Sequence, residues 1–435
     1  MSLNTMVTAS KSRRMAARRS IAIQGAPSRR SFLGGTMAAS CAAVTLPAGG
    51  LFAAGKQRLR IGLVGCGGRG TGAALQALEA DPSVSLVALG DVFPDQVASS
   101  AELLGRRAGD RFDCPPTRWF VGPESYRSVI ASGVDLVLLA APPHVRPLHL
   151  EAAVAAGKHV YCEKPVAIDG AGVVRATAAA ARSRASGLAL VSGFCFRHDP
   201  RMLEMVARIH DGVIGRPRVV QTHAAIGLPW RKPVESGQEP GGWPLANWIS
   251  FARFSGGHFV EQHVQAIDRA AWILGDVPPV IAEPIAPEAA ATMADPRSSR
   301  HCSRQQSTGA IGDCPAATAV RYRFAGGQTI EASIDRRERS SDWAVETVIG
   351  STGRCDLLQG TMVGSRSWIA NPAPGPGRHR ATMETLVRGI LSGTVPHDGD
   401  QMCRSTLMAV MGRMASETGR SVAWSGLAGS GSHLA

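Results

Sequence analysis

The sequence lacks the patterns that would indicate a metal site or a membrane-spanning helix. None of the nine cysteines stands in C-x-x-C spacing, and no His/Cys arrangement typical of zinc occurs in the 435 residues, so we expect no metal. The uncharged run 34–55 is too rich in glycine, and is interrupted by Pro47, so it is a poor candidate for a helix that crosses a bilayer. We therefore expect no stable membrane span.

Acidic residues are absent from the first 55 positions, which hold seven Lys and Arg residues. Subtracting those seven from the formal charge of +13 leaves +6 for the rest of the chain. That surplus is spread along the sequence, so we expect no nucleic acid or other polyanion as a partner.

The motif Ser28-Arg29-Arg30-Ser31-Phe32-Leu33, followed by a weakly apolar run, matches a twin-arginine export signal. We interpret residues 1–55 as a leader read by the twin-arginine translocation machinery, and we expect a periplasmic or otherwise exported mature protein. That route carries folded proteins, so a cofactor would be loaded in the cytoplasm and stay tightly bound. Lipidation at Cys41 is the alternative interpretation of this segment.

Eight cysteines remain beyond the leader. An oxidising compartment permits disulfides, and Cys302 and Cys314 lie close enough in a polar loop to form one. Cys66, Cys162 and Cys195 fall in or beside predicted buried strands, and we interpret them as small apolar residues.

The chain is organised around a short apolar run, residues 60–64, that leads directly into glycines and then into an Ala/Leu-rich helical pattern. Gly65, Gly67 and Gly70 have the spacing G-x-G-x-x-G of a dinucleotide-binding turn. The first permits a sharp turn, the second lets a pyrophosphate approach the backbone, and the third lets the helix pack on the strand. Because helix amides would bind the phosphates, Gly68 and Arg69 are also assigned to cofactor binding.

Asp91 ends the next predicted strand, 21 positions after the last glycine of the turn. An acidic side chain there accepts hydrogen bonds from both ribose hydroxyls and repels a 2′-phosphate, which predicts NAD rather than NADP. The alternative is that Asp91 only caps the helix predicted from Pro94 onward.

Strand and helix patterns alternate up to residue 193, which is typical of a doubly wound parallel sheet with its ligand at the carboxyl ends of the strands. Two further turns follow predicted strands at those ends. We assign their residues to the cofactor site as well: Pro143, His144, Glu163 and Lys164.

Lys164 is the candidate catalytic residue. Only five of the 47 basic residues are lysines, and this one stands where a nicotinamide would lie. Partial desolvation lowers the pKa of a lysine, so its amine could take a proton from a hydroxyl while hydride leaves the same carbon. The alternative is a solvated surface lysine.

These motifs together resemble the glucose-fructose oxidoreductase/inositol dehydrogenase (Gfo/Idh/MocA) family of sugar and cyclitol dehydrogenases. The likeness is carried by the glycine turn, Asp91 and the segments 141–144, 157–166, 192–194 and 256–268, of which Glu163-Lys164-Pro165 is the most specific. Residues 405–415 are similar to the closing helix of the exported bacterial branch, so the resemblance covers nearly all of residues 56–424.

The resemblance implies a Rossmann domain over residues 56–193, an α+β domain over residues 194–424 with an open, mostly antiparallel sheet, and a flexible tail over 425–435. Such a sheet forms subunit contacts in the family, so a homo-oligomer is expected. Hydrophobic patterns independently predict strands in this half, with Gly326-Gly327 as a hairpin turn, at residues 218–225, 318–324, 329–335 and 344–349. The polar segment 287–315 is interpreted as a surface loop.

The family's substrate-side helix usually has an acidic residue and, four positions later, a histidine. Here these positions are Glu261 and Gln265, which share a helix face and are both candidate catalytic residues, although Gln265 cannot titrate. We expect further substrate contacts from Arg197, Trp248, His263 and Asp268. A buried structural role is the alternative for His263, and ordinary packing for Arg197 and Trp248.

Three arginines near position 337 are interpreted as a solvated sheet face rather than an anion site, namely Arg336, Arg337 and Arg339. The sequence thus predicts an exported NAD(P)-dependent oxidoreductase acting on a small carbohydrate substrate, at a hydroxyl of a sugar, glycoside or cyclitol. Two alternatives stay open. One is an NAD-dependent glycosidase that works by transient oxidation and elimination, and the other is a catalytically silent sugar- or nucleotide-binding protein.

Overall fold

The computed structural model describes residues 58–233, 242–286, 312–336, 343–370 and 375–428. The predicted leader, Cys302, Arg337 and Arg339 lie outside these residues, as does most of the predicted surface loop. Within the described ranges, no helix is both long enough and apolar enough to cross a membrane.

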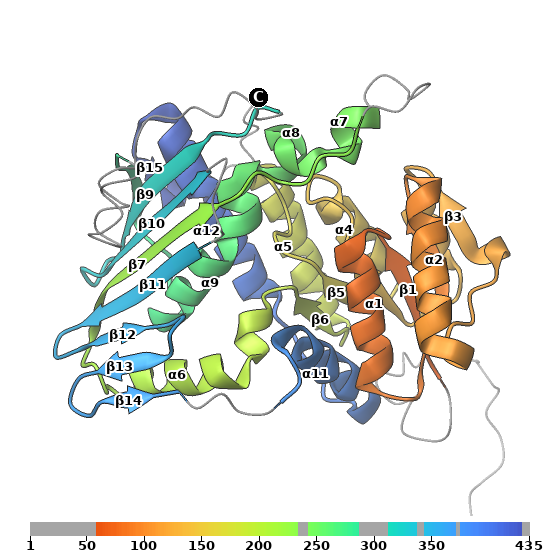
Figure 1. Cartoon of the computed structure of the whole chain (residues 1–435), viewed down its shortest axis with the longest axis horizontal. Helices are drawn as coiled ribbons and strands as arrows, with labels where there is room; N and C mark the ends of the chain where they lie inside the picture. Colours follow the sequence, from red (N-terminus) through yellow and green to blue (C-terminus); the bar gives the residue numbers. More distant parts are fainter. Residues whose placement is uncertain (1–57, 234–241, 287–311, 337–342, 371–374, 429–435) are drawn as a thin grey trace, which may run out of the picture. The chain divides into compact units, whose positions relative to one another are not determined.

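The first part of the described chain forms a six-stranded parallel sheet in the order β3-β2-β1-β4-β5-β6 (Figure 1). Its strands are β1 Leu59–Val64, β2 Val84–Asp91, β3 Trp119–Val121, β4 Leu136–Leu139, β5 His159–Cys162 and β6 Leu190–Ser192. The helices between them are α1 Gly68–Ala80, α2 Pro94–Ala108, α3 Ser125–Ala131, α4 Arg146–Ala155 and α5 Gly170–Ala185. The strand order reverses at β1, where doubly wound sheets bind their ligands.

Helices cover both faces of this sheet, so its strands are apolar on both sides. In β4, Leu136 and Leu138 belong to the core that includes Ala73 of α1 and Val97 of α2. The intervening Val137 and Leu139 belong to a second core with residues of α3, α4 and α5. The continuous apolar runs predicted as buried parallel strands are therefore confirmed.

A helix from the far end of the chain, α11 Arg378–Ser392, also belongs to the first sheet. Its apolar side chains share a core with α1 and β4, and are fully or almost fully buried: Met383, Leu386, Val387 and Ile390. These residues fall within the predicted second domain, residues 194–424, but they pack on the first sheet.

The second sheet has nine strands in the order β14-β13-β12-β11-β7-β10-β9-β8-β15 (Figure 1). Only the pairing of β7 with β10 is parallel among those described, which confirms the predicted fold class of a Rossmann sheet followed by an α+β domain. The strands are β7 Pro217–Ile226, β8 Ile281–Pro284, β9 Ala317–Arg323, β10 Thr329–Arg336, β11 Trp343–Gly350, β12 Arg354–Asp356, β13 Thr361–Val363, β14 Trp368–Ile369 and β15 Val422–Ala423.

The four strands predicted in this half agree with β7, β9, β10 and β11 to within about one residue at each end. The hairpin predicted at Gly326-Gly327 joins β9 to β10, and Gly327 has the positive φ of +80° that such a turn requires.

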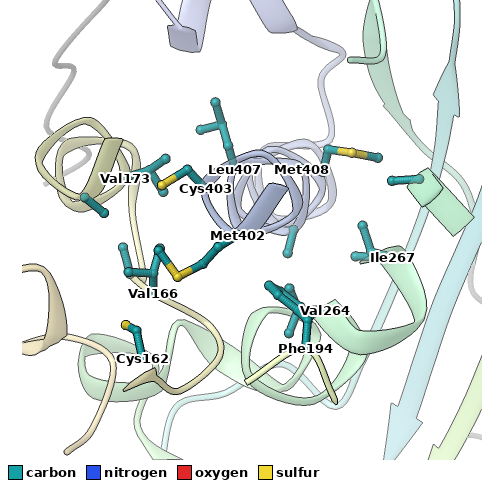
Figure 2. Packing of buried hydrophobic residues seen from close by; sticks show 14 of the residues in the cluster. Cys162, Val166, Val173, Phe194, Val264, Ile267, Met402, Cys403, Leu407 and Met408 are labelled. Atoms are coloured by element: carbon teal, nitrogen blue, oxygen red, sulfur yellow. The ribbon is translucent and has the colours of Figure 1, made fainter. Parts of the chain in front are cut away.

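Helix α12, Gly399–Thr418, holds the two sheets together through an apolar surface that reaches most of the way around it. Figure 2 shows Met402 directed toward Val166 and Cys162 of the first domain, while Val264 and Ile267 of the second domain lie on another side of the helix. The Tyr322 hydroxyl of β9 donates to the carbonyl of Met408 at 2.8 Å.

The remaining helices belong mainly to the second domain, and the single turns occur in both domains. They are α6 Pro200–His210, α7 Gly242–Ala246, α8 Ala252–Ser255, α9 Val264–Ile273 and α13 Trp424–Ala428, with single turns η2 Gly109–Arg111, η3 Pro116–Arg118, η4 Cys195–His198, η5 Trp248–Ser250 and η6 Phe259–His263. Because α13 continues to Ala428, the first four residues of the predicted flexible tail are helical.

Candidate active site

The glycine turn divides into positions that the fold requires and positions that it leaves open. Gly65 has φ of +95°, and a Cβ there would lie 2.4 Å from the Ala141 nitrogen. A Cβ on Gly70 would lie 1.8 Å from the carbonyl oxygen of Gly65. Gly67 would meet only a side-chain atom of Gln96 at 3.9 Å, and Gly68 would meet nothing within 4 Å. The first pair therefore builds the turn, and the second pair leaves space above it.

This open space suits the pyrophosphate of a dinucleotide. Gly67 is the N-cap of α1 and provides no side chain that accepts from the first helical amides. Amides at a helix start lack intrahelical acceptors and carry a partial positive charge, so they bind phosphate oxygens well. The residues present thus fit the cofactor that the sequence predicts.

Asp91 joins the glycine turn to the start of α2. Its Oδ2 accepts from the Cys66 amide at 2.7 Å, and its Oδ1 accepts from the Phe93 amide at 3.0 Å. Burial raises the pKa of this carboxyl group, while these amide hydrogen bonds oppose the shift. Each oxygen can accept more than one hydrogen bond, so ribose hydroxyls could still bind there.

Replacing Asp91 by Asn tests the predicted choice between NAD and NADP. A hydrogen bond to a charged acceptor is worth about 1.5–3 kcal/mol, so we expect NAD to bind about tenfold more weakly while NADP loses nothing. Calorimetric titration of the nucleotide-free protein with both cofactors measures this change. Asp95→Asn in the exposed start of α2 is the control, and an equal loss for both nucleotides would contradict the assignment.

The Glu163-Lys164-Pro165 turn follows β5 and contains a cis peptide bond before Pro165. Arg146, at the start of α4, donates to the carbonyls of Ala141 and Pro165 and so connects two turns at the carboxyl end of the sheet. Only 3% of Arg146 is exposed. Arg146 was not among the predicted site residues, because its role depends on backbone carbonyls that become neighbours only in the folded sheet.

Lys164 is directed toward the substrate-side helix rather than into bulk water. Its Nζ donates to Glu261 Oε1 at 3.0 Å and to the Glu261 carbonyl at 2.5 Å. The Lys164 side chain is 19% exposed and that of Glu261 10%. The amine and the carboxylate that the sequence placed in one site therefore form a direct ion pair.

Glu163, which the sequence assigned to the cofactor site, makes contacts with other residues of the protein. Its Oε1 accepts from the buried Tyr161 hydroxyl at 2.7 Å and pairs with Arg69 Nε at 3.1 Å, while Oε2 accepts from the Lys164 amide at 3.1 Å. The side chains of Glu163 and Arg69 thus neutralise one another, while the Arg69 amide remains in the first turn of α1, where the prediction assigns it to the phosphates. The side-chain contacts fix the backbone beside Lys164.

Glu261 lies in η6, a single turn of π-helix that continues into α9. Such wide turns occur often at functional sites. Burial raises the pKa of Glu261, and the Lys164 charge opposes that shift. Its Oε2 is buried without a hydrogen-bond partner among the described residues.

Gln265 lies on the side of the helix that faces the first domain. Its Nε2 donates to the carbonyl of Gly193 at 3.1 Å, and its Oε1 is buried with no partner in the described part of the chain. Gln265 and Glu261 therefore each have one buried oxygen that accepts no hydrogen bond from the described residues.

His263 is not part of this site, which corrects its assignment as a substrate residue. Its Nε2 lies 2.9 Å from the Thr222 hydroxyl of β7, and its ring stacks on Phe259. The side chain is turned toward the second sheet and is 3% exposed. Burial lowers the pKa of His263 to about 3.

Acid should therefore destabilise the protein in part through His263. The unfolded chain takes up a proton near the ordinary pKa of 6.5, whereas the folded protein does so only near 3. Stability from this residue is complete above pH 6.5 and falls by about 1.4 kcal/mol per pH unit below it.

We expect His263→Gln to make the free energy of unfolding less dependent on pH between about 6 and 4, by about 1.4 kcal/mol per unit. Urea unfolding at several pH values measures this slope. Thr222→Val is the control, because it removes the contact without removing the titrating group. Equal slopes for wild type and His263→Gln would contradict the prediction.

Arg197 and Asp268 are also buried away from the site, so their assignment as substrate residues is wrong. Arg197 donates twice to Asp268 at 2.9 Å from Nη2 and Nε, and it pairs with Asp276 at 2.7 Å. Asp268 is fully buried and also accepts from the Ser405 hydroxyl at 2.7 Å. These ion pairs and hydrogen bonds connect η4, α9 and α12.

The remaining predicted site residues are Pro143, His144 and Trp248. Pro143 is buried, and the ring of His144 packs on Phe254 of α8 with 4.9 Å between centroids. Burial and the Arg146 charge lower the pKa of His144 to about 4, so the ring is neutral at pH 7. Trp248 is partly exposed in η5, and the structure shows no side-chain contact that brings it to Lys164.

Comparison with known proteins agrees with this fold. Residues 59–188 match the sequence model of the Gfo/Idh/MocA group, described as an oxidoreductase family with an NAD-binding Rossmann fold. Inositol 2-dehydrogenase 4 of Saccharopolyspora erythraea is 35% identical over 162 residues, which are 37% of this chain and 44% of that protein. The dTDP-3,4-didehydro-2,6-dideoxy-alpha-D-glucose 3-reductase of Actinomadura kijaniata is 31% identical over 161 residues, 37% of this chain and 43% of the relative.

The chain thus matches less than half the length of either relative. Among solved structures, an aldose-aldose oxidoreductase from Caulobacter crescentus, complexed with glycerol, has a TM-score of 0.62 at 21% identity. That match covers 84% of this chain and 100% of the other, so the likeness in fold extends over both domains.

Proposed function

We propose that this chain is an NAD-dependent enzyme of the Gfo/Idh/MocA family that oxidises a hydroxyl of a sugar, glycoside or cyclitol, a proposal supported by the match of residues 59–188 to that family's sequence model. The observation that carries the proposal is the Lys164 amine, which lies 3.0 Å from Glu261 at the carboxyl end of the parallel sheet. Bound NAD would supply the hydride acceptor.

Side chains of the protein itself transfer the proton of the substrate hydroxyl. In the ion pair the Lys164 ammonium first passes a proton to Glu261 Oε1, and the amine freed in this way then takes the proton of the substrate hydroxyl. The raised pKa of Glu261 makes this carboxylate a better proton acceptor than an exposed glutamate. Arg146 and Glu163 hold the turn, so that the amine keeps one position during the reaction.

The proposal extends to a cofactor that stays bound through turnover, to export by the twin-arginine route, and to a homo-oligomer. Nucleotide released by denaturing the purified protein would identify the cofactor and its redox state. A sugar and cyclitol panel would then reveal which compounds change the absorbance of the bound nicotinamide. An enzyme of this kind should release about one nucleotide per chain and respond to at least one compound.

A glycosidase is the second candidate, favoured by the direct pairing of two titratable groups. Oxidation at C3 of a glycoside acidifies the C2 hydrogen, so elimination of the aglycone, addition of water and return of the hydride give hydrolysis with no net redox change. Comparing ketone with free nitrophenol from nitrophenyl glycosides separates the two enzymes. A nucleotide whose absorbance responds to no compound, with no nitrophenol released, would instead favour a silent binding protein.

A further inference from the structure

Arg336 contradicts the interpretation of its segment as a solvated sheet face. It ends β10, where Ile330, Ala332 and Ile334 point toward the helices and are buried. Side chains alternate along a strand, so Arg336 continues this buried face. Only 8% of Arg336 is exposed.

No described carboxylate compensates the charge of Arg336. Its Nη2 contacts Nε2 of His258, and its Nε is buried without a partner among the described residues. Asp335, the neighbouring acid, points to the opposite face of β10 and lies 3.6 Å from His223. Burial and the Arg336 charge lower the pKa of His258 to about 3, so this histidine is neutral at pH 7.

A buried guanidinium facing a neutral imidazole is an unfavourable arrangement in an empty protein. Buried charges are normally paired, because moving an ion out of water without a counter-charge carries a large free-energy penalty. A second arginine nearby, Arg413, donates to the Gly256 carbonyl and lies 3.8 Å from Glu417, which partly balances it. The charge of Arg336 thus has no counter-charge in the part of the chain that the structure describes.

This charge lies close to the Lys164–Glu261 pair. His258 is the N-cap of η6 and precedes Glu261 by three residues, so the two lie within one wide turn of the same helical segment. The same stretch presents buried side-chain oxygens with no partner within the described residues, on Glu261, Gln262 and Gln265. A cation beside several free acceptors matches a ligand that carries one anionic group and several hydroxyls.

We propose that Arg336 and His258 form a subsite for a carboxylate, so that the preferred substrate is a sugar acid or its glycoside. A single uncompensated guanidinium suits the single charge of a carboxylate better than the double charge of a phosphate. The carboxylate binds Arg336, and the sugar hydroxyls donate to the free oxygens beside Lys164. This inference rests on the proposed function, since it names the substrate class of the same site.

The test compares methyl hexosides with the matching methyl hexuronides of gluco, galacto and manno configuration, with hexose 6-phosphates as a third group. Calorimetry measures binding to the nucleotide-loaded protein, and nicotinamide absorbance measures oxidation. We expect at least one uronide to bind about 10–100-fold more tightly than its neutral partner. Equal binding, or a preference for the phosphates, would overturn the subsite.

Arg336→Met separates a binding role from a structural one. This variant should lose the preference for the uronide, yet unfold at a higher temperature than wild type without ligand, because it removes an unpaired buried charge. Arg321→Met is the matched control on β9, because it breaks an ion pair with Glu331 on the other face of the sheet. It should lower the melting temperature and leave the preference unchanged.

Arg336→Gln is a second variant for use if Arg336→Met does not fold. A lower melting temperature in both Arg336 variants, with the uronide preference intact, would show that Arg336 is structural. The two proposals fail differently. Uronide binding without any nicotinamide response contradicts the oxidoreductase, whereas oxidation of neutral sugars that Arg336→Met leaves unchanged contradicts only the subsite.

Discussion

Replacing Lys164 by Met should lower kcat by about 10²–10⁴-fold, the usual contribution of a positioned acid or base. Nucleotide should stay bound, because the glycine turn and Asp91 lie on other strands than Lys164. Turnover is measured with the best sugar of the panel, and bound nucleotide is measured after denaturation. Retention of more than about a tenth of wild-type turnover would contradict a role in proton transfer.

Two further variants make this result interpretable. Lys164→Met leaves Glu261 buried without its partner, and such losses destabilise proteins by about 3–5 kcal/mol. The double variant with Glu261→Gln removes both charges and should recover most of that stability, yet remain inactive. Lys158→Met, just before β5 at the opposite end of the strand from the site, should change neither activity nor nucleotide content.

Substitutions within the glycine turn should separate folding from cofactor binding. A Cβ at Gly70 would lie 1.8 Å from a backbone oxygen of Gly65, so Gly70→Ala forces the turn apart. We expect a loss of about 4 kcal/mol or more, or no soluble protein at all. Thermal unfolding and soluble yield measure this effect.

Gly67→Ala has room for its methyl group and should change stability by only about 1 kcal/mol. Its methyl group would stand in the open space above the turn, so nucleotide affinity should fall at least about tenfold. Gly72→Ala, inside α1 with no close neighbour, serves as the control: it should leave nucleotide affinity unchanged and raise stability by about 1 kcal/mol. Tight nucleotide binding by Gly67→Ala would contradict the placement of the pyrophosphate.

The sequence could predict the features that depend on local pattern. Turn glycines, apolar parallel strands and the Glu-Lys-Pro segment each have a fixed relation to the strand before them, so they predicted the sheet and the position of Lys164. The family resemblance assigned Lys164 and Glu261 to one site, but their direct ion pair was found only in the structure.

Residues on the substrate-side helix were harder to predict, because the direction of each side chain depends on packing. His263 and Asp268 are polar, yet the second sheet and Arg197 provide buried partners for them. Arg336 could have been recognised, since it is in register with three apolar residues of β10. Arg146 could not, because the carbonyls that it binds belong to separate turns.

The return of α11 to the first sheet limits how the chain can be divided. A fragment ending near residue 193 would expose the surface on α1 and β4 that Met383 and Leu386 cover, and it should aggregate rather than fold alone. A chimera that exchanges the substrate half between relatives would have to keep residues 378–392 together with the nucleotide-binding half. The nucleotide-binding half and the substrate half therefore depend on one another for folding, although they contain separate sheets.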